Sequence, residues 1–127
     1  MELIRAGEVR AFSNSGVTSR QLIFPENSSS GRLTITHVIV EPGAKNPPHR
    51  HPTSEQIWVA LRGNGKLVLD AGRTEPFCEG DIVRFEDGEL HGFENTSGTD
   101  FEYLSVTSPP VNFREAYERK WSQKAKE

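Results

Sequence analysis

Apolar residues along this chain alternate with polar ones in short runs, and Gly, Asp or Asn turns bound most of these runs. A period close to two is the pattern of strands that bury one face. In the clearest run, Leu33, Ile35 and Ile39 share one face. The runs recur about every ten residues, which indicates a sandwich or barrel and not alternating strand–helix units. The expected strands cover 17–24, 33–39, 56–61, 66–69, 77–78, 81–85, 91–95 and 101–106.

The pattern changes after the sequence Ser-Pro-Pro at 108–110, which ends the last expected strand. Asn112 is suited to cap a helix, and Glu115 stands where a capping box places its acidic partner. Four apolar residues then follow at helical spacing, namely Phe113, Ala116, Tyr117 and Trp121. The sequence therefore predicts a short C-terminal helix over about 112–125 that packs on the sheet.

Composition and charge narrow the function classes. The 127 residues fit one domain over 1–127. Fifteen Lys and Arg against 18 Asp and Glu give a net charge of −3 without a basic stripe, which argues against nucleic acid as a partner. No run approaches the roughly 18 apolar residues of a membrane span. Cys78 is the only cysteine, which excludes an internal disulfide, and no signal region follows Met1, so we expect a cytoplasmic protein.

A pair of histidines follows two prolines. His49 and His51 are separated by one residue, so on an extended backbone both imidazoles project to the same side. Pro47 and Pro48 restrict the backbone just before them and lower the entropic cost of holding this arrangement. Two imidazoles side by side are suited to bind one metal ion.

Two spaced patterns extend this observation. The first, from Gly43 to Gly63, follows G-x5-H-x-H-x3,4-E-x6-G with one ambiguity, and the second, from Gly80 to Asn95, follows G-x5-P-x-G-x2-H-x3-N with Glu86 in place of Pro. In order and spacing, they resemble the two motifs of the cupin superfamily. The resemblance implies an all-β fold, a double-stranded β-helix or jelly-roll barrel, with one divalent metal ion in its mouth.

Carried over from the motifs, the resemblance implies His49, His51 and His91 as metal ligands, with either Gln56 or Glu55 as the fourth. The metal could be Ni, Zn, Fe, Mn, Cu or Co, because imidazole and oxygen ligands suit all of them. A neutral Gln56 would leave the full charge of a divalent ion and favour Lewis-acid chemistry, whereas Glu55 would favour a redox centre.

The register of the strand at 56–61 decides between the two. Six residues separate Gln56 from Gly63, as the motif requires, whereas three residues separate His51 from Glu55, which the motif also permits. We favour Gln56, because the strand end fixes register better than a loop does. Trp58 then faces the pocket as well.

Further pocket and proton-transfer residues are expected near the metal. Phe93 and Asn95 share the face of His91 by alternation, and with Trp58 they are our candidate pocket residues. Tyr103 and His37 are candidates for moving a proton during catalysis.

Fold does not select one function among cupins. We expect a small metalloenzyme, of isomerase or lyase type, that acts on a small polar carbonyl or sugar-acid substrate. The alternatives are an Fe-dependent dioxygenase that uses Glu55, and a non-catalytic small-molecule-binding cupin. Gln56 and the segment 103–110 are similar to small cupins of pectin and uronate breakdown, but Val111 stands near the place where those carry an Arg, and the nearest arginine is Arg114.

Assembly can be predicted from the same strand register. With Gln56 inward, Ile57, Val59 and Leu61 form an outward-facing apolar row, which another surface would have to shield from water. Small cupins commonly dimerise, so we expect a homodimer with a small molecule as its ligand or substrate.

Overall fold

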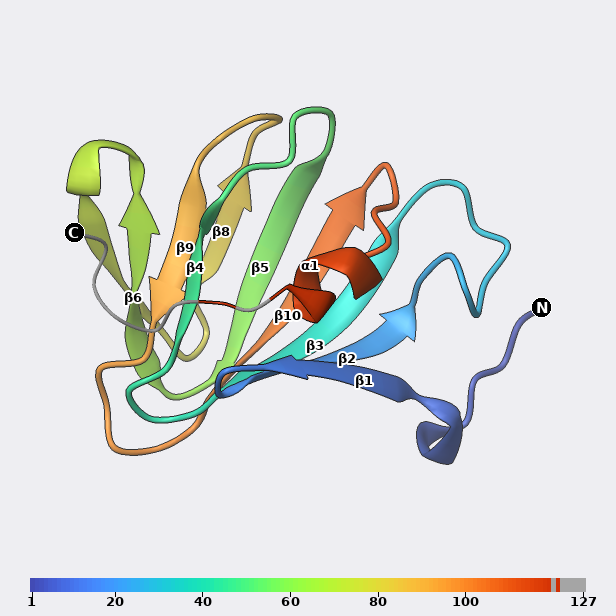
Figure 1. Ribbon diagram of the computed structural model, residues 1–127, viewed down its shortest axis with the longest axis horizontal. Coiled ribbons are helices and arrows are strands. Elements are labelled where there is room, and N and C mark those ends of the chain that lie inside the picture. The colour runs from blue at the N-terminus through green and yellow to red at the C-terminus, as the bar shows by residue number, and fades with distance from the viewer. Residues whose placement is uncertain (120, 122–127) are drawn as a thin grey trace.

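In the computed structural model, which describes residues 1–119 and 121, ten strands form two antiparallel sheets (Figure 1). The first sheet has the order β1 (Arg10–Asn14), β2 (Val17–Ile23), β3 (Thr34–Val40), β10 (Phe101–Ser108), β5 (Glu55–Arg62) and β8 (Ile82–Phe85). The second has the order β4 (Lys45–His49), β9 (His91–Glu94), β6 (Asn64–Leu69) and β7 (Thr74–Cys78). Two 3-10 turns, η1 (Ala6–Glu8) and η2 (Asp70–Gly72), and the helix α1 (Arg114–Glu118) complete the described elements. None of these helices is long and apolar enough to cross a bilayer.

The predicted all-β fold is confirmed. The hydrophobic periodicity did not predict two of the strands, β1 and β4. β1 has a polar sequence and an edge position, and it is held by its backbone pairing with β2. β4 contains Pro47 and Pro48 and pairs with β9 through a register shift between Asn46 and His49. Both strands depend on a neighbour and not on their own alternation, which explains why hydrophobic periodicity did not identify them.

The interior of the barrel changes from apolar to polar along the strands. At one end Val40 pairs with Phe101, and at the other Thr34 pairs with Thr107, which in turn pairs with Gln56. All five side chains are buried. The apolar end is filled by the rings of Phe77, Phe93 and Phe101, and Trp58, Phe85 and Tyr103 extend this aromatic core toward the polar end. The polar end leaves room for a cavity, because hydroxyl groups there replace large side chains.

The C-terminal helix is shorter than predicted. α1 covers 114–118 instead of about 112–125, and position 119 is already extended. Asn112 does accept a hydrogen bond from the backbone N–H of Arg114 at 3.0 Å, although Phe113 occupies the capping position. The predicted positions 120 and 122–127 lie outside the described residues. The Asn14 side chain on β1 donates to the carbonyls of Tyr117 and Arg119, so tertiary contacts replace the next helical turn.

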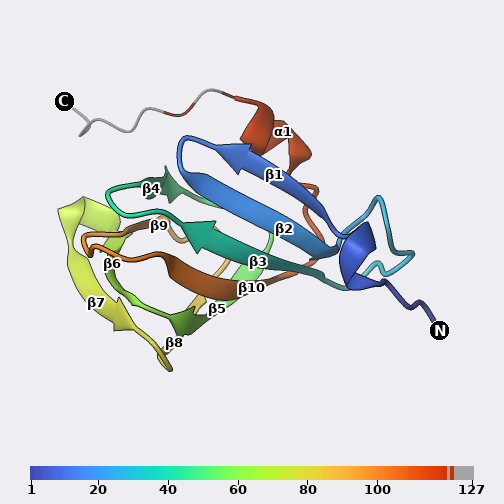
Figure 2. The same cartoon turned by 90° about the horizontal axis from the view of Figure 1, so that it is seen from below.

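The segment around α1 lies against β1 (Figures 1 and 2). The Glu26 carboxylate holds this segment in place, because it accepts hydrogen bonds from Arg114 at 2.5 Å and from Arg10 at 2.6 Å. The hydrogen bonds from Arg114 and Asn112 lower the pKa of Glu26 to about 2. These contacts place Phe113 and Tyr117 at the polar end of the barrel, where both line the cavity.

Candidate metal centre and its cavity

Three histidines meet where β4 and β9 approach each other. His49 ends β4 and pairs with His91, the first residue of β9, while His51 follows two residues after β4. Gly92 permits this approach, because a Cβ there would lie 2.8 Å from the Asn46 carbonyl oxygen. One ring nitrogen from each of the three imidazoles lies within 4.8 Å of those of the other two. The backbone pairing therefore brings together side chains from the two motifs, although His91 follows His51 by 40 residues in the sequence.

Backbone carbonyls fix the tautomer of two of these imidazoles. Nδ1 of His49 lies 2.7 Å from the carbonyl oxygen of Pro47, and Nδ1 of His91 lies 2.8 Å from that of Glu89. A carbonyl oxygen only accepts, so each Nδ1 carries the proton and donates it. In both neutral rings, Nε2 therefore keeps a lone pair for another partner, the arrangement that metal-binding imidazoles use.

Burial keeps the three imidazoles neutral. It is the first cause that lowers the pKa of His51 to about 4 and of His91 to about 3, and it also lowers the pKa of His49. Nε2 of His51 is buried and has no hydrogen-bond partner among the described residues. A buried polar atom without a partner costs free energy, and a bound cation would remove that cost.

Gln56 lies beside the histidines with its oxygen directed at them. Its Nε2 donates to the Thr107 hydroxyl at 2.8 Å, which orients the amide, and Trp58 Nε1 donates to its Oε1 at 3.1 Å. The same Oε1 lies 2.9 Å from Nε2 of His91. Because the His91 proton is on Nδ1, two lone pairs face each other there, and a cation between them would turn repulsion into attraction. Three imidazole nitrogens and an amide oxygen fit a divalent metal.

Glu55 points to the other side of the strand. Its carboxylate forms an ion pair with Arg84 on β8, with 2.7 Å between Oε1 and Nε. Gln56, Trp58 and Ala60 are buried on the inner face of β5, so the strand has the register that ends at Gly63. The carboxylate of Glu55 is therefore turned away from the three imidazoles.

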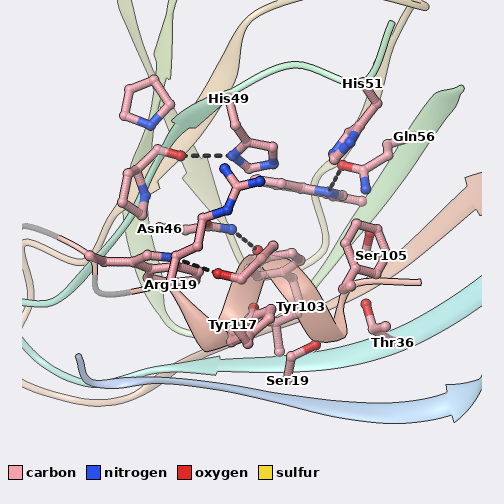
Figure 3. A pocket seen from close by; sticks show the side chains of 17 residues that line it. Ser19, Thr36, Asn46, His49, His51, Gln56, Tyr103, Ser105, Tyr117 and Arg119 are labelled. Carbon is pink, nitrogen blue, oxygen red and sulfur yellow. Dashed lines mark hydrogen bonds between the residues drawn. The ribbon is translucent and has the colours of Figure 1, made fainter. Parts of the chain in front are cut away.

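A cavity of about 270 Å³ opens beside the histidines (Figure 3). Serine and threonine hydroxyls from the first sheet form one part of its wall, and aromatic rings from the barrel and the C-terminal segment form much of the rest. The hydroxyl-bearing group is Ser19, Thr36 and Ser105, and the aromatic group is Trp58, Tyr103, Phe113, Tyr117 and Trp121. Arg119 is the only cavity residue with a permanent charge among those the structure describes, and it bonds to Glu115 at 3.0 Å.

The structure separates some predicted residues from this cavity. Trp58 and Tyr103 line it. Phe93 does not: its ring stacks on Phe101 at 4.2 Å between centroids, deep in the apolar end. Asn95 also lies elsewhere, because its side chain donates to the carbonyls of Val40 and Thr99 and so fixes a turn. The expectation that Phe93 and Asn95 line the pocket is corrected by these contacts.

The position of His37 also requires a correction. β3 buries Thr36 and Val38, which line the cavity, so His37 between them lies on the opposite face of the sheet. There its Nδ1 lies 2.9 Å from Arg20 and its Nε2 lies 2.8 Å from Glu102. A residue on the outer face cannot transfer a proton to a molecule inside the barrel, and we assign His37 no catalytic role.

The sequence did not identify the cavity residues that come from β2 and the C-terminal segment. Ser19, Phe113 and Tyr117 belong to this group. The helical spacing of Phe113 and Tyr117 predicts packing on the sheet, and Tyr117 does pack against the core; both rings also line the cavity, which the spacing alone does not indicate. The surplus of aromatic residues in this segment was the available signal.

Comparison with known proteins identifies relatives of the whole fold. Residues 36–107 match the family model described as Cupin domain. The polyketide cyclase RemF from Streptomyces resistomycificus is similar with a TM-score of 0.71 and 32% identity, over 88% of this chain and 84% of that one. An uncharacterized protein from Methanocaldococcus jannaschii is 28% identical over 100 residues, 79% of each chain. The oxalate-binding protein of Thermotoga maritima is 37% identical over 65 residues, 51% of this chain and 53% of that protein.

The depressed pKa values predict how the stability of metal-free protein depends on pH. The pKa of His51 falls from 6.5 to about 4 on folding, so between these pH values the unfolded chain binds more protons than the folded one. Stability should therefore rise with pH across this window. In urea titrations with a chelator present, we expect the unfolding midpoint to drop from pH 6.5 to pH 4, and to drop less in His51→Asn. Equal slopes for both proteins would contradict this assignment.

Proposed function

The chain belongs to the cupin family, and from this premise we propose that it is a small metalloenzyme acting on a carbonyl substrate through one divalent metal ion. The observation that carries the proposal is the convergence of donor atoms on one point. Nε2 of His49 and of His91 face it with fixed tautomers, and the buried Nε2 of His51 lacks a partner among the described residues. The amide oxygen of Gln56 stands next to them.

These four residues would hold the metal, and each is prepared by its neighbours. Carbonyl oxygens orient His49 and His91, and the Thr107 hydroxyl orients Gln56. When bound, a divalent ion in this neutral ligand set would supply a Lewis acid that polarises a carbonyl oxygen and stabilises developing negative charge. The neutral amide in place of a carboxylate supports this chemistry over redox chemistry, because it leaves the charge of the ion undiminished.

Tyr103 is our candidate for hydrogen-bond or proton donation to the substrate. Its hydroxyl lies inside the cavity wall, where the Asn46 amide donates to it at 2.9 Å. Burial raises the pKa of Tyr103 well above 10, so the phenol keeps its proton at neutral pH. A protonated phenol serves as a donor to a substrate oxygen and not as a general base.

The charge of the cavity supports a carbonyl substrate over a sugar acid. A sugar acid carries a carboxylate, and a cationic side chain free to pair with it would support such a substrate in addition to the metal. Arg114, the arginine nearest to the end of β10, bonds instead to Glu26 outside the cavity, and Arg119 bonds to Glu115. The 32% identity to a polyketide cyclase also supports the carbonyl substrate.

The structure supports the alternatives unequally. An Fe-dependent dioxygenase would gain from Glu55 as a ligand, and Glu55 is paired with Arg84 on the outer face. Non-catalytic binding of a small molecule is favoured by one observation, the 37% identity to an oxalate-binding protein over about half of each chain. Turnover, and not binding, separates this second candidate from the first.

The metal assignment predicts a specific order among variants. Elemental mass spectrometry on protein purified without an affinity tag should find about one metal equivalent per wild-type chain. His91→Ala should lose the metal, and Gln56→Ala should bind it about tenfold more weakly or worse. Glu55→Ala is the matched control, because its side chain lies one position away on the other face, and it should keep the full equivalent. Loss of metal in Glu55→Ala with full retention in Gln56→Ala would refute the assignment.

The enzyme proposal predicts metal-dependent activation of a ketone. In D₂O, metal-loaded protein should exchange the methyl protons of acetophenone about tenfold faster or more than metal-free protein. Proton NMR measures this exchange without knowledge of the natural substrate, and His91→Ala serves as the control. Equal exchange rates for loaded and metal-free protein, with acetophenone bound by both, would favour the non-catalytic binding protein.

We further propose that the chain forms a homodimer through the outer face of the first sheet, and a cytoplasmic location stays a prediction. Half-buried apolar side chains gather on this face from β3, β5 and β10, namely Ile35, Ile39, Ile57, Val59, Leu104 and Val106. Leu61 and Ile82 are 46% and 69% exposed beside them. An apolar surface of this kind is typical of an interface.

The dimer can be tested by a charge placed at the centre of the proposed interface. Val59→Lys should shift the sedimentation mass from twice 14.2 kDa to that of one chain, because a buried unpaired lysine opposes association. Thr74→Lys, exposed on β7 in the other sheet, is the control and should stay dimeric. A wild-type mass near 14.2 kDa at working concentration would overturn this proposal.

A further inference from the structure

Two tyrosine hydroxyls outside the metal centre belong to the same cavity. Tyr103 reaches it from β10 and Tyr117 from α1 (Figure 3). They are close enough that a charge on Tyr117 would raise the pKa of Tyr103. A phenol can donate one hydrogen bond and also accept others, so the role of each hydroxyl in the cavity depends on where its proton points.

Two hydrogen bonds on β2 prepare the side of the cavity where Tyr117 lies. Gln21 is fully buried, and its Nε2 lies 3.1 Å from the backbone carbonyl oxygen of Ser19 and 2.8 Å from the Ser19 hydroxyl. A carbonyl only accepts, so the amide orientation is fixed and the Ser19 oxygen accepts from Gln21. Ser19 is left with its own proton to donate; it lines the cavity together with Tyr117, and its hydroxyl acts to lower the pKa of that phenol.

A Ser19 hydroxyl that donates to the Tyr117 oxygen would leave the Tyr117 proton free for a molecule in the cavity. In Tyr103 this arrangement is present, since the Asn46 amide donates to its oxygen at 2.9 Å. Burial raises the pKa of Tyr117 to about 12 and that of Tyr103 well above its usual value, so both phenols stay protonated at neutral pH. Two protonated phenols, one of which accepts from the Asn46 amide, therefore line one cavity.

The rest of the cavity wall, apart from the two tyrosines, favours a ligand that carries few hydrogen-bond donors. Trp58 and Phe113 offer aromatic surface, and Arg119 is already bonded to Glu115. Burying an unsaturated, uncharged molecule in such a cavity costs little free energy, whereas burying a carboxylate without a partner costs much more.

We propose that Tyr103 and Tyr117 form a pair of hydrogen-bond donors that binds the carbonyl oxygens of an uncharged substrate with several carbonyl groups, such as a 1,3-diketone. This inference rests on the proposed function and names its substrate class. It gives the C-terminal segment a role in recognition, since Tyr117 belongs to α1. Gln21 and Ser19 are positioning residues, which act through the orientation of the Tyr117 hydroxyl.

The test compares two probes with one carbon skeleton. Benzoylacetone carries two carbonyl groups, and 1-phenylbutane-1,3-diol carries two hydroxyls in their place. Isothermal titration of the zinc-loaded protein should show tighter binding of the diketone. Tyr103→Phe and Tyr117→Phe keep the ring and remove one hydroxyl each, and each should weaken diketone binding by about three- to tenfold. Zinc content, measured on the same samples, should match wild type.

The outcomes separate this inference from the proposed function. Unchanged diketone affinity in both phenylalanine variants, with binding lost in His91→Ala, would overturn the donor pair and leave the metal site in place. Diketone binding that depends on Tyr117 but is equal with and without zinc would leave the donor pair and contradict the metalloenzyme. Tighter binding of the diol or of galacturonate than of the diketone, or no diketone binding at all, would overturn the inference.

Discussion

The hydrogen bonds from His49 and His91 to backbone carbonyls are the constraint on which the site depends. Each ring donates Nδ1–H to a carbonyl two residues earlier in the chain, at Pro47 and at Glu89. Because the donated proton fixes the tautomer, Nε2 of each ring keeps a lone pair, and that of His91 lies 2.9 Å from the Gln56 oxygen. The prolines before His49 hold the backbone that supplies one of these carbonyls, and Phe85, stacked on His91 at 4.2 Å, holds the other ring in place.

The same logic of donors and acceptors extends through the barrel. Buried polar groups need hydrogen-bond partners, and the pairing seen here leaves particular donor and acceptor atoms available to a ligand. Gln56 donates to Thr107 and directs its oxygen at His91, while Ser19 accepts from Gln21 and keeps its own proton to donate. The barrel combines an acceptor-rich point at the histidines with donor hydroxyls further along its cavity. This combination suits a substrate whose oxygens accept hydrogen bonds.

The sequence predicted the features that depend on spacing. The interval from Gln56 to Gly63 gave the register of β5, and the fold followed from the order of the two motifs. Position along a strand was harder to judge: Phe93 shares a strand with His91, yet two residues carry it into the apolar end. His37 was misplaced because both faces of β3 carry apolar residues, so alternation alone did not say which face is inside. The helix ended early because Asn14, distant in sequence, bonds its last carbonyls.

The central claim is that three imidazoles and one amide oxygen hold a single divalent ion at the polar end of the barrel. X-ray absorption spectroscopy at the zinc edge of the zinc-loaded protein tests it most directly. We predict a first shell of nitrogen and oxygen with outer-shell scattering from three imidazole rings. A spectrum with sulfur in the first shell, which only Cys78 or Met1 could supply, or with scattering from fewer than two imidazoles, would contradict the account.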